Sequence, residues 1–226
     1  PMAHRVGDCE AMLAASKRGG VKLMVGLCLR FWPAYQALRK LVSSGELGKL
    51  ESLSMRRNSS RPEWGSWYKD SNVARELLTY DVDVLLWIGG KPKLITARRV
   101  GSKKAAKQIF AIYEWSKAKV LMQASMLPAK MLPFRHGFLA TFEEGAMEYD
   151  PSVKPELEVY PKNSEGYVPE LPMATGMFQG LELTAYVSEL QYFANCVKAD
   201  KETADAPPQS ARDGIAIVQE TLEATE

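Results

Sequence analysis

The sequence of 226 residues has few of the side chains that build disulfide frameworks or metal sites. Its three cysteines, Cys9, Cys28 and Cys196, are far apart, and its only histidines are His4 and His136. An odd, sparse set of cysteines argues against a disulfide framework and for a reducing compartment. Because neither a CxxC nor an HxxxH pattern occurs, we expect no structural or catalytic zinc site.

Long apolar runs and an excess of one charge are also lacking. No apolar run approaches the roughly 20 residues that a membrane span requires, and the opening PMAHRVGDCEAM is mixed and polar rather than a secretory signal. The net charge of +2 gives no electrostatic reason to expect nucleic acid. We therefore expect a cytoplasmic protein without a membrane or nucleic-acid partner.

Nucleotide and hydrolase fingerprints are missing too. The sequence contains no GxGxxG, no GxxxxGK and no GxSxG, so the chain itself shows no dinucleotide loop and no hydrolase nucleophile elbow. It opens with Pro1 and Met2 and stops inside the helical pattern VQETLEATE. We expect it to be part of a longer protein.

The pattern of apolar residues predicts helices and strands in a clear order. Periodicity with glycine and proline boundaries predicts helices at 5–18, 30–49, 75–87, 181–200 and 210–225. Short apolar runs predict strands at 21–27, 50–57, 92–102, 108–116, 119–127, 134–145, 146–150 and 157–161. Consecutive strands with short turns imply an open, mostly antiparallel sheet with helices on one face. The predicted class is α+β, preceded by one helix-strand remnant of an α/β unit.

The predicted helix at 75–87, RELLTYDVDVLLW, is a candidate active-site helix. At 100° per residue, Glu76, Tyr80, Asp83 and Trp87 fall within a narrow arc. One interpretation is a polar cluster that faces a pocket, with a carboxylate as base and a phenol as acid or donor. The alternative is a helix with one wetter face. Asp81 lies on the apolar side, where a carboxylate needs buried partners.

Two further features have both a functional and a structural interpretation. The segment 57–72 interleaves basic and aromatic residues, including Trp67, Tyr68 and Lys69. Such a loop binds sugars or single-stranded nucleic acid, or its tryptophans fold back onto the core; the small net charge favours a sugar-like ligand. His136 lies in a strand pattern without a ligand partner, which favours a hydrogen-bonded structural histidine.

Several motifs in order resemble oxidoreductases of the Gfo/Idh/MocA family, the glucose–fructose oxidoreductase and inositol dehydrogenase group. They are LRFWPAY, SGELGKL, DVDVLLWIGGKP and the final ELQYFANCV…P…ARDGIAIVQ. The resemblance covers nearly the whole chain. It implies that residues 1–27 are the end of a Rossmann domain for NAD or NADP, and that 28–226 are the C-terminal domain for substrate and oligomerisation. It also implies hydride transfer on a sugar or polyol, and a homo-oligomer formed through the open sheet face.

The departures from the family pattern concern the catalytic residues. Pro1 matches the proline of the family's Glu-Lys-Pro motif at the cofactor, whose lysine would precede this sequence. In the second motif, Glu76 takes the place of an aspartate and Tyr80 that of a histidine. An ordinary phenol has a pKa near 10, against about 6.5 for imidazole, and is a poorer acid–base group at neutral pH. The resemblance suggests Arg30, Trp67, Tyr68 and Lys69 as substrate-binding residues.

The sequence leaves two hypotheses open. In the first, the chain is the C-terminal domain of a sugar or polyol oxidoreductase with divergent catalytic positions, which binds no cofactor and catalyses no redox reaction by itself. In the second, it is a non-enzymatic ligand-binding or oligomerisation protein without a Rossmann domain. Substrate identity and the choice between NAD and NADP stay open.

Overall fold

The computed structural model describes residues 1–60, 72–127, 132–172 and 181–225. Its helices are α1 (Val6–Gly19), the 3-10 helix η1 (Cys28–Phe31), α2 (Pro33–Ser44), the π-helix η4 (Ala74–Leu78), α3 (Thr79–Gly89), α4 (Leu181–Lys198) and α5 (Pro208–Glu223). Its strands are β1 (Leu50–Ser60), β2 (Lys93–Gly101), β3 (Ala106–Trp115), β4 (Ala118–Leu127), β5 (Arg135–Phe142), β6 (Gly145–Tyr149) and β7 (Leu157–Pro161).

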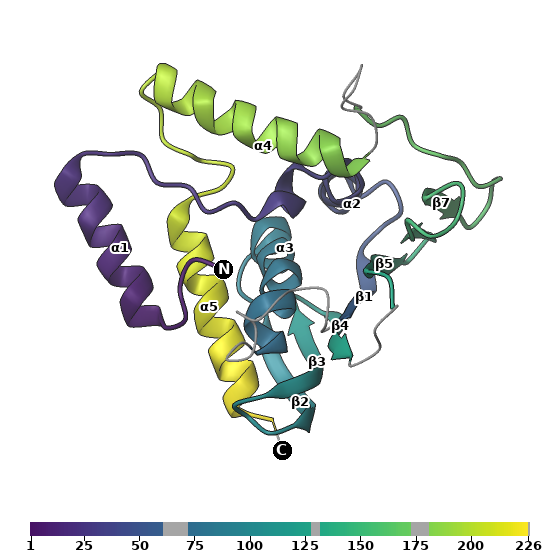
Figure 1. The fold of residues 1–226 in the computed structure, drawn as a ribbon. Helices are drawn as coiled ribbons and strands as arrows, with labels where there is room; N and C mark the ends of the chain where they lie inside the picture. The colour runs from purple at the N-terminus through teal and green to yellow at the C-terminus, as the bar shows by residue number, and fades with distance from the viewer. Residues whose placement is uncertain (61–71, 128–131, 173–180, 226) are drawn as a thin grey trace.

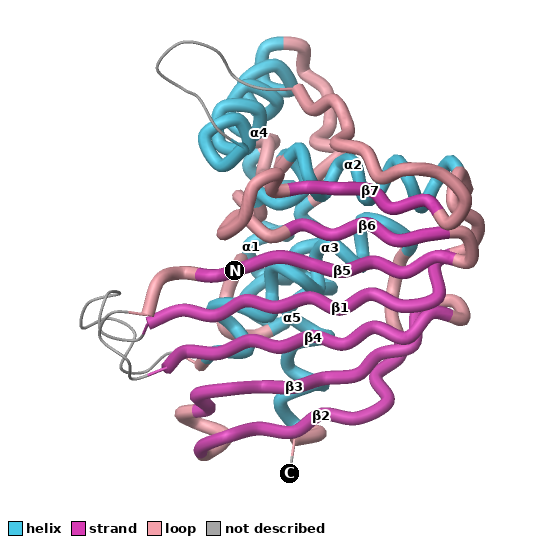
Figure 2. The backbone as a smooth tube through the Cα atoms, turned by 90° about the vertical axis from the view of Figure 1, so that its right-hand side faces the viewer, coloured by secondary structure: helices cyan, strands magenta, loops and turns pink. Residues whose placement is uncertain are grey.

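One twisted sheet organises the domain. Its described strands follow the order β2-β3-β4-β1-β5-β6-β7. Only the β1–β4 pair among them is parallel, and the other pairs are antiparallel. Figure 2 shows the strands in front and the helices behind them, so the helices cover one face. The predicted α+β class, with an open and mostly antiparallel sheet, is confirmed.

Local sequence signals explain where α2 begins and where α1 and α2 end. Pro33 occupies the first turn of α2, where its missing N–H is no loss. Gly45 ends this helix with φ 67°, and Gly20 ends α1 with φ 62°. Both glycines adopt the left-handed conformation that favours a residue without a side chain. Gly20 and Gly45 are therefore actual helix caps, and the helix predicted at 30–49 is shorter, spanning Pro33–Ser44.

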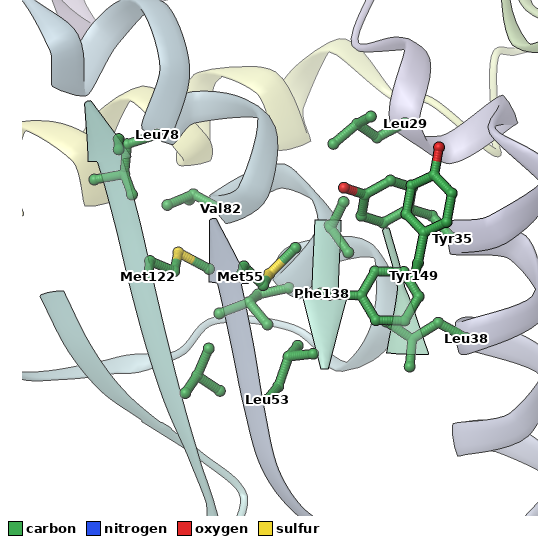
Figure 3. Packing of buried hydrophobic residues seen from close by; sticks show 14 of the residues in the cluster. Leu29, Tyr35, Leu38, Leu53, Met55, Leu78, Val82, Met122, Phe138 and Tyr149 are labelled. Atoms are coloured by element: carbon green, nitrogen blue, oxygen red, sulfur yellow. The ribbon is translucent and has the colours of Figure 1, made fainter. Parts of the chain in front are cut away.

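The main core fills the space between the sheet and helices α2 and α3 (Figure 3). Met55 and Met122 lie side by side in the parallel β1–β4 register, beneath Val82 of α3. Tyr35 of α2 packs against Phe138 and Tyr149, with ring centroids 5.2 and 5.9 Å apart. These aromatic contacts join α2 to β5 and β6. The core thereby fixes the sheet end that carries the candidate site.

The N-terminal segment departs from its prediction at one element. Residues 21–27 were expected to form a strand, but the structure assigns them no strand. A strand needs a neighbour for its backbone groups, and none of the described strands pairs with this segment. Helix α1 instead lies beside α5 (Figure 1), and Cys9 and Leu27 share a small core with Ile215. The expected domain boundary at residue 27 stays a prediction.

Strand β1 is longer than its sequence pattern indicated. Residues 57–60 were expected to begin a loop, but β1 continues to Ser60. The strand is paired on both sides, with β4 as far as Ser60 and with β5 as far as Asn58. Pairing on two edges satisfies the backbone of this polar stretch and holds it extended. As a result Arg57 is a residue of the central strand.

The face of the sheet away from the helices carries a row of apolar side chains. Ile112, Leu121 and Leu139 are each 37–44% exposed. Ile112 of β3 pairs with Leu121 of β4, and Leu121 and Leu139 of β5 both pair with Ser54 of β1, which lies between them. Exposed apolar side chains on an open sheet face are a candidate contact surface. Within the described residues, no helix is long and apolar enough to cross a bilayer.

Candidate functional site

A buried ion pair joins the central strand to helix α3. Arg57 Nη2 lies 2.8 Å from Asp81 Oδ1, and Arg57 Nε lies 3.3 Å from Oδ2. The side chains are 4% and 1% exposed. Arg57 Nη2 also lies 3.5 Å from the Tyr35 hydroxyl oxygen. The neighbouring Asp81 carboxylate raises the pKa of Arg57 despite its burial, so the guanidinium stays charged. The partner that Asp81 was predicted to need is therefore Arg57.

A second buried pair holds the same helix from the other side. Arg30 of η1 contacts Asp83 through two bonds, Nε to Oδ2 at 2.7 Å and Nη2 to Oδ1 at 2.5 Å. Its third nitrogen, Nη1, donates to the Asp205 carbonyl at 2.9 Å. Burial raises the pKa of Asp83, and the Arg30 hydrogen bonds and charge oppose that rise. Two arginines from different elements thus fix the first turns of α3.

Between these pairs, a change of helix type orients Tyr80. Residues Ala74–Leu78 form a π-helix that runs directly into α3. The Asn72 side chain accepts a hydrogen bond from the Ala74 N–H at 2.9 Å, and the Thr79 hydroxyl donates to the Arg75 carbonyl at 2.7 Å. Single π-helical turns inside α-helices are rare and occur frequently at functional sites. Tyr80 follows this turn immediately.

A cavity of about 180 Å³ opens beside Tyr80. Its described lining comes from η1, β1, η4, α3, β5 and α4, and from the residues just before α2 and β5. The lining residues are Cys28, Leu29, Trp32, Arg57, Leu77, Tyr80, Phe134, His136 and Tyr186. The volume is many times the space that a single water needs. Its walls combine aromatic rings with a few polar groups, as small-molecule sites usually do.

The polar side chains of the cavity are held in their neutral forms. Burial, together with the charges of neighbouring acidic groups, raises the pKa of Tyr80. Burial likewise raises the pKa of the Cys28 thiol to about 11. Burial, together with the adjacent Arg57 cation, lowers the pKa of His136 to about 3. At neutral pH the cavity therefore presents a phenol, a thiol and an uncharged imidazole, beside an arginine whose charge Asp81 matches.

Glu189 of α4 lies behind this lining. Its side chain is 7% exposed, and its Oε1 has no hydrogen-bond partner among the described residues. Both carboxyl oxygens pack against Gly26, where an added Cβ would lie 3.6 Å from each. Burial, with the nearby Asp83 charge, raises the pKa of Glu189 to about 7. The carboxyl is therefore partly protonated at neutral pH.

The site residues predicted from the sequence do not all lie at the cavity. Tyr80 lines the cavity, whereas Glu76 lies on the π-helix, half-buried and outside the lining. Arg30 is buried and directs its donors at groups of the protein. Pro1 is exposed. Their assignments to catalysis, substrate binding and cofactor binding stay predictions. Trp67, Tyr68 and Lys69, predicted to bind substrate, lie outside the described residues.

Of the two interpretations of this helix face, a polar cluster that faces one pocket does not agree with the structure. Tyr80 lines the cavity described above, Trp87 lines a separate one, and Asp83 is buried against Arg30. The arc was drawn at 100° per residue, but the π-helical turn at Glu76 holds more residues than an α-helical one. The spacing between Glu76 and Tyr80 is therefore not that of a regular α-helix.

His136 also corrects a prediction. It was expected to be a hydrogen-bonded structural histidine, but its buried Nδ1 has no hydrogen-bond partner in the described structure. Instead, aromatic rings surround it and one edge reaches the cavity. Sequence reasoning also passed over Trp32, Tyr186 and Glu189 as site residues. Trp32 lies between η1 and α2, whereas Tyr186 and Glu189 lie on α4, so no local pattern could have brought Trp32 together with the other two.

No cluster of three metal-binding side chains occurs among the residues described. A dinucleotide is not matched by the residues present either, since the sequence holds no glycine-rich phosphate loop. The cavity can exclude water, donate hydrogen bonds and place a ligand oxygen against a phenol.

Comparison with known proteins identifies the family. The family model described as "GFO/IDH/MocA C-terminal domain" matches residues 35–160. The chain belongs to the GFO/IDH/MocA family. The match includes β1 to β6 and helix α3, and therefore the Arg57–Asp81 pair and Tyr80, whereas Arg30 of the second pair lies before it. The resemblance seen in the sequence motifs is confirmed.

Curated relatives include inositol 2-dehydrogenases. The Rhizobium meliloti enzyme of that name is 24% identical over 228 residues, covering 96% of this chain and 64% of its own length. The Corynebacterium glutamicum enzyme is 38% identical over 68 residues, covering 30% of this chain and 20% of its own length. The chain thus spans less than two thirds of the length of these relatives.

Solved structures share the fold. The aldose-aldose oxidoreductase from Caulobacter crescentus, complexed with glycerol, has a TM-score of 0.80 at 18% identity and covers 99% of this chain and 68% of its own. A levoglucosan dehydrogenase in complex with NADH and levoglucosan has a TM-score of 0.78 at 15% identity, covering 99% and 69%. At these identities the likeness concerns the fold alone.

The environment of Glu189 predicts a dependence of stability on pH. Its pKa rises from 4.5 to about 7 in the folded state, so the folded protein binds more protons than the unfolded chain between these values. Stability from this residue is present below about pH 4.5 and is lost as the pH rises through about 7, by up to about 3 kcal/mol. Glu189→Gln should remove most of this loss. Urea unfolding of both proteins at pH 5 and pH 8 measures it.

The matched control is Glu165→Gln, since Glu165 is exposed. The Glu165→Gln variant should show the same difference in unfolding free energy between pH 5 and pH 8 as the wild type. An equal loss of unfolding free energy in wild type and Glu189→Gln contradicts the assignment.

Proposed function

We propose that this chain is the substrate-binding C-terminal domain of an NAD(P)-dependent oxidoreductase acting on a sugar or polyol. The observation that supports the proposal is Tyr80, which lies at the family's histidine position and lines the cavity. Relatives named inositol 2-dehydrogenase and neighbours named as sugar oxidoreductases point to the same substrate class. The dinucleotide belongs to another part of the full protein, and the chain alone is proposed to catalyse no redox reaction.

In this proposal Tyr80 acts as an acid. Its raised pKa keeps the phenol protonated at neutral pH. A protonated phenol can donate a hydrogen bond, and then a proton, to a carbonyl oxygen that gains charge during reduction. Taking a proton from a hydroxyl during oxidation would require the phenolate form of Tyr80. Burial disfavours that charged form. The Arg57 guanidinium lies 5.4 Å from the centre of the Tyr80 ring and fixes the ring beside the cavity.

Removing the hydroxyl tests this role. In the intact protein supplied with NADH or NADPH and keto forms of inositols and aldoses, Tyr80→Phe should lower kcat by about 10²–10⁴-fold with little change in KM. Steady-state absorbance of the reduced cofactor measures it. Tyr160→Phe is the control, because the hydroxyl of this exposed tyrosine contacts only Glu158 among the described side chains.

Undiminished turnover by Tyr80→Phe removes Tyr80 from the chemistry. A complete lack of turnover by the wild-type intact protein favours the second candidate, a ligand-binding or oligomerisation protein. One observation supports that candidate. No lysine occurs among the described residues that line the cavity, and the Arg57 charge, which lowers the pKa of the Tyr80 phenol, is outweighed by burial.

The open sheet face is the proposed surface for a homo-oligomer. Ile112, Leu121 and Leu139 are exposed apolar side chains on this face, with Ser54 of β1 between the two leucines, and none of the described helices covers it (Figure 2). Leu121→Lys should lower the oligomer mass measured by sedimentation velocity, since a buried lysine at a contact requires desolvation. Val168→Lys, at an exposed site in the segment after β7, is the control. A strictly monomeric wild type contradicts the proposal.

A further inference from the structure

His136 is the residue of the cavity that the proposed function leaves unused. It lies on β5 directly opposite Arg57 of β1 in the antiparallel register. Both side chains are buried, and both line the cavity beside Tyr80. Side chains of directly paired residues lie on the same face of a sheet. The two residues therefore form one part of the cavity floor.

Three aromatic rings hold the imidazole in place. Trp32 meets it at 5.0 Å between ring centroids with an angle of 84°, and Tyr149 and Phe134 lie at 5.6 and 5.3 Å. The Trp32 indole N–H is itself fixed by a 2.9 Å hydrogen bond to the Tyr149 hydroxyl. A ring packed on several sides loses little further freedom when a ligand binds. Such preorganisation is typical of a binding residue.

The two ring nitrogens are not equivalent. Nδ1 is enclosed and has no hydrogen-bond partner in the described structure, so contact with a ligand falls to Nε2. A neutral imidazole carries one N–H. Placing that N–H on the enclosed nitrogen would bury a donor without an acceptor, which is unfavourable. Placing it on Nε2 directs the donor to the nitrogen that a ligand can reach.

We propose that His136 is a specificity-determining residue of this cavity, whose Nε2–H donates a hydrogen bond to an uncharged ligand oxygen. The ligand is a hydroxyl- or carbonyl-bearing polyol or keto sugar, a class taken from the proposed function, on which this inference rests. Arg57 is the only cation among the described lining residues, and Asp81 matches its charge. The described lining thus offers no free charge to a carboxylate or phosphate.

The role of His136 differs from that of Tyr80. The imidazole stays neutral and transfers no proton, since its pKa lies far below neutrality. It orients the ligand through a bond that is equally present before and during reaction. Loss of such a bond raises KM and leaves kcat nearly unchanged. Loss of the Tyr80 hydroxyl has the opposite effect, so the two roles separate in kinetics.

Nitrogen-15 spectra of the histidine rings test the inference without turnover. The intact protein, labelled at histidine, is titrated with myo-inositol, D-glucose and glycerol in turn. His4→Gln identifies the signals of the exposed His4. We expect His136 to be the Nε2–H tautomer throughout pH 5–8, and at least one probe to shift its Nε2 signal saturably while His4 stays unchanged. An Nδ1–H tautomer, titration within that range, or no shift with any probe overturns the inference.

Variants provide the second measurement. His136→Phe keeps a flat ring but loses the donor and should weaken the affinity for the bound probe about tenfold. His136→Gln retains a donor and should recover part of that loss. Equal affinities of all three proteins overturn the inference, and circular dichroism shows whether both variants are folded. Turnover with unchanged KM in His136→Phe refutes this inference alone, whereas binding without any turnover refutes the proposed oxidoreductase alone.

Discussion

The buried pair of Arg57 and Asp81, with its counterpart Arg30 and Asp83, is the constraint on which the site depends. Both aspartates belong to α3, and the two arginines come from β1 and η1. Removing one partner of such a pair typically costs about 3–5 kcal/mol, because the other charge is left buried and unpaired. The two pairs thereby fix how α3 sits on the sheet. The direction of Tyr80, which lies between the aspartates and the π-helix, follows from that placement.

The same burial decides the electrostatics of the cavity. Burial disfavours the charged form of a titratable group unless a partner of opposite charge lies beside it. Tyr80 and Cys28 therefore stay protonated, and His136 stays neutral. Arg57 keeps its charge because Asp81 compensates it. A cavity of neutral hydrogen-bonding groups and aromatic rings suits an uncharged polyol better than an anion. Glu189, with a pKa of about 7, changes its charge near physiological pH.

Sequence reasoning succeeded where the signal was local. Helix ends at Gly20 and Gly45 follow from glycine itself, and the strands from 92 onward follow from alternation and turns. It failed at 21–27, because an apolar run becomes a strand only beside a neighbour. It also failed at 57–60, where pairing on two edges extended a polar stretch.

The site shows the same division between local and tertiary information. The unusual Asp81 indicated a buried partner, but only the fold identified Arg57. Tyr80 was identified first from its place on the helix face and then from the family motif. His136 was set aside because it lacked a sequence neighbour of matching chemistry, and its aromatic surroundings come from elements far apart in the chain. Residues whose role depends on a cavity cannot be recognised before the cavity exists.

The measurement that tests the account most directly is a structure of the intact protein with NAD(P)H and a bound polyol or keto sugar. The account predicts the ligand in the cavity, with one oxygen within hydrogen-bond distance of the Tyr80 hydroxyl and another within that distance of His136 Nε2. A ligand bound elsewhere on the protein, with the cavity beside Tyr80 empty, would contradict it.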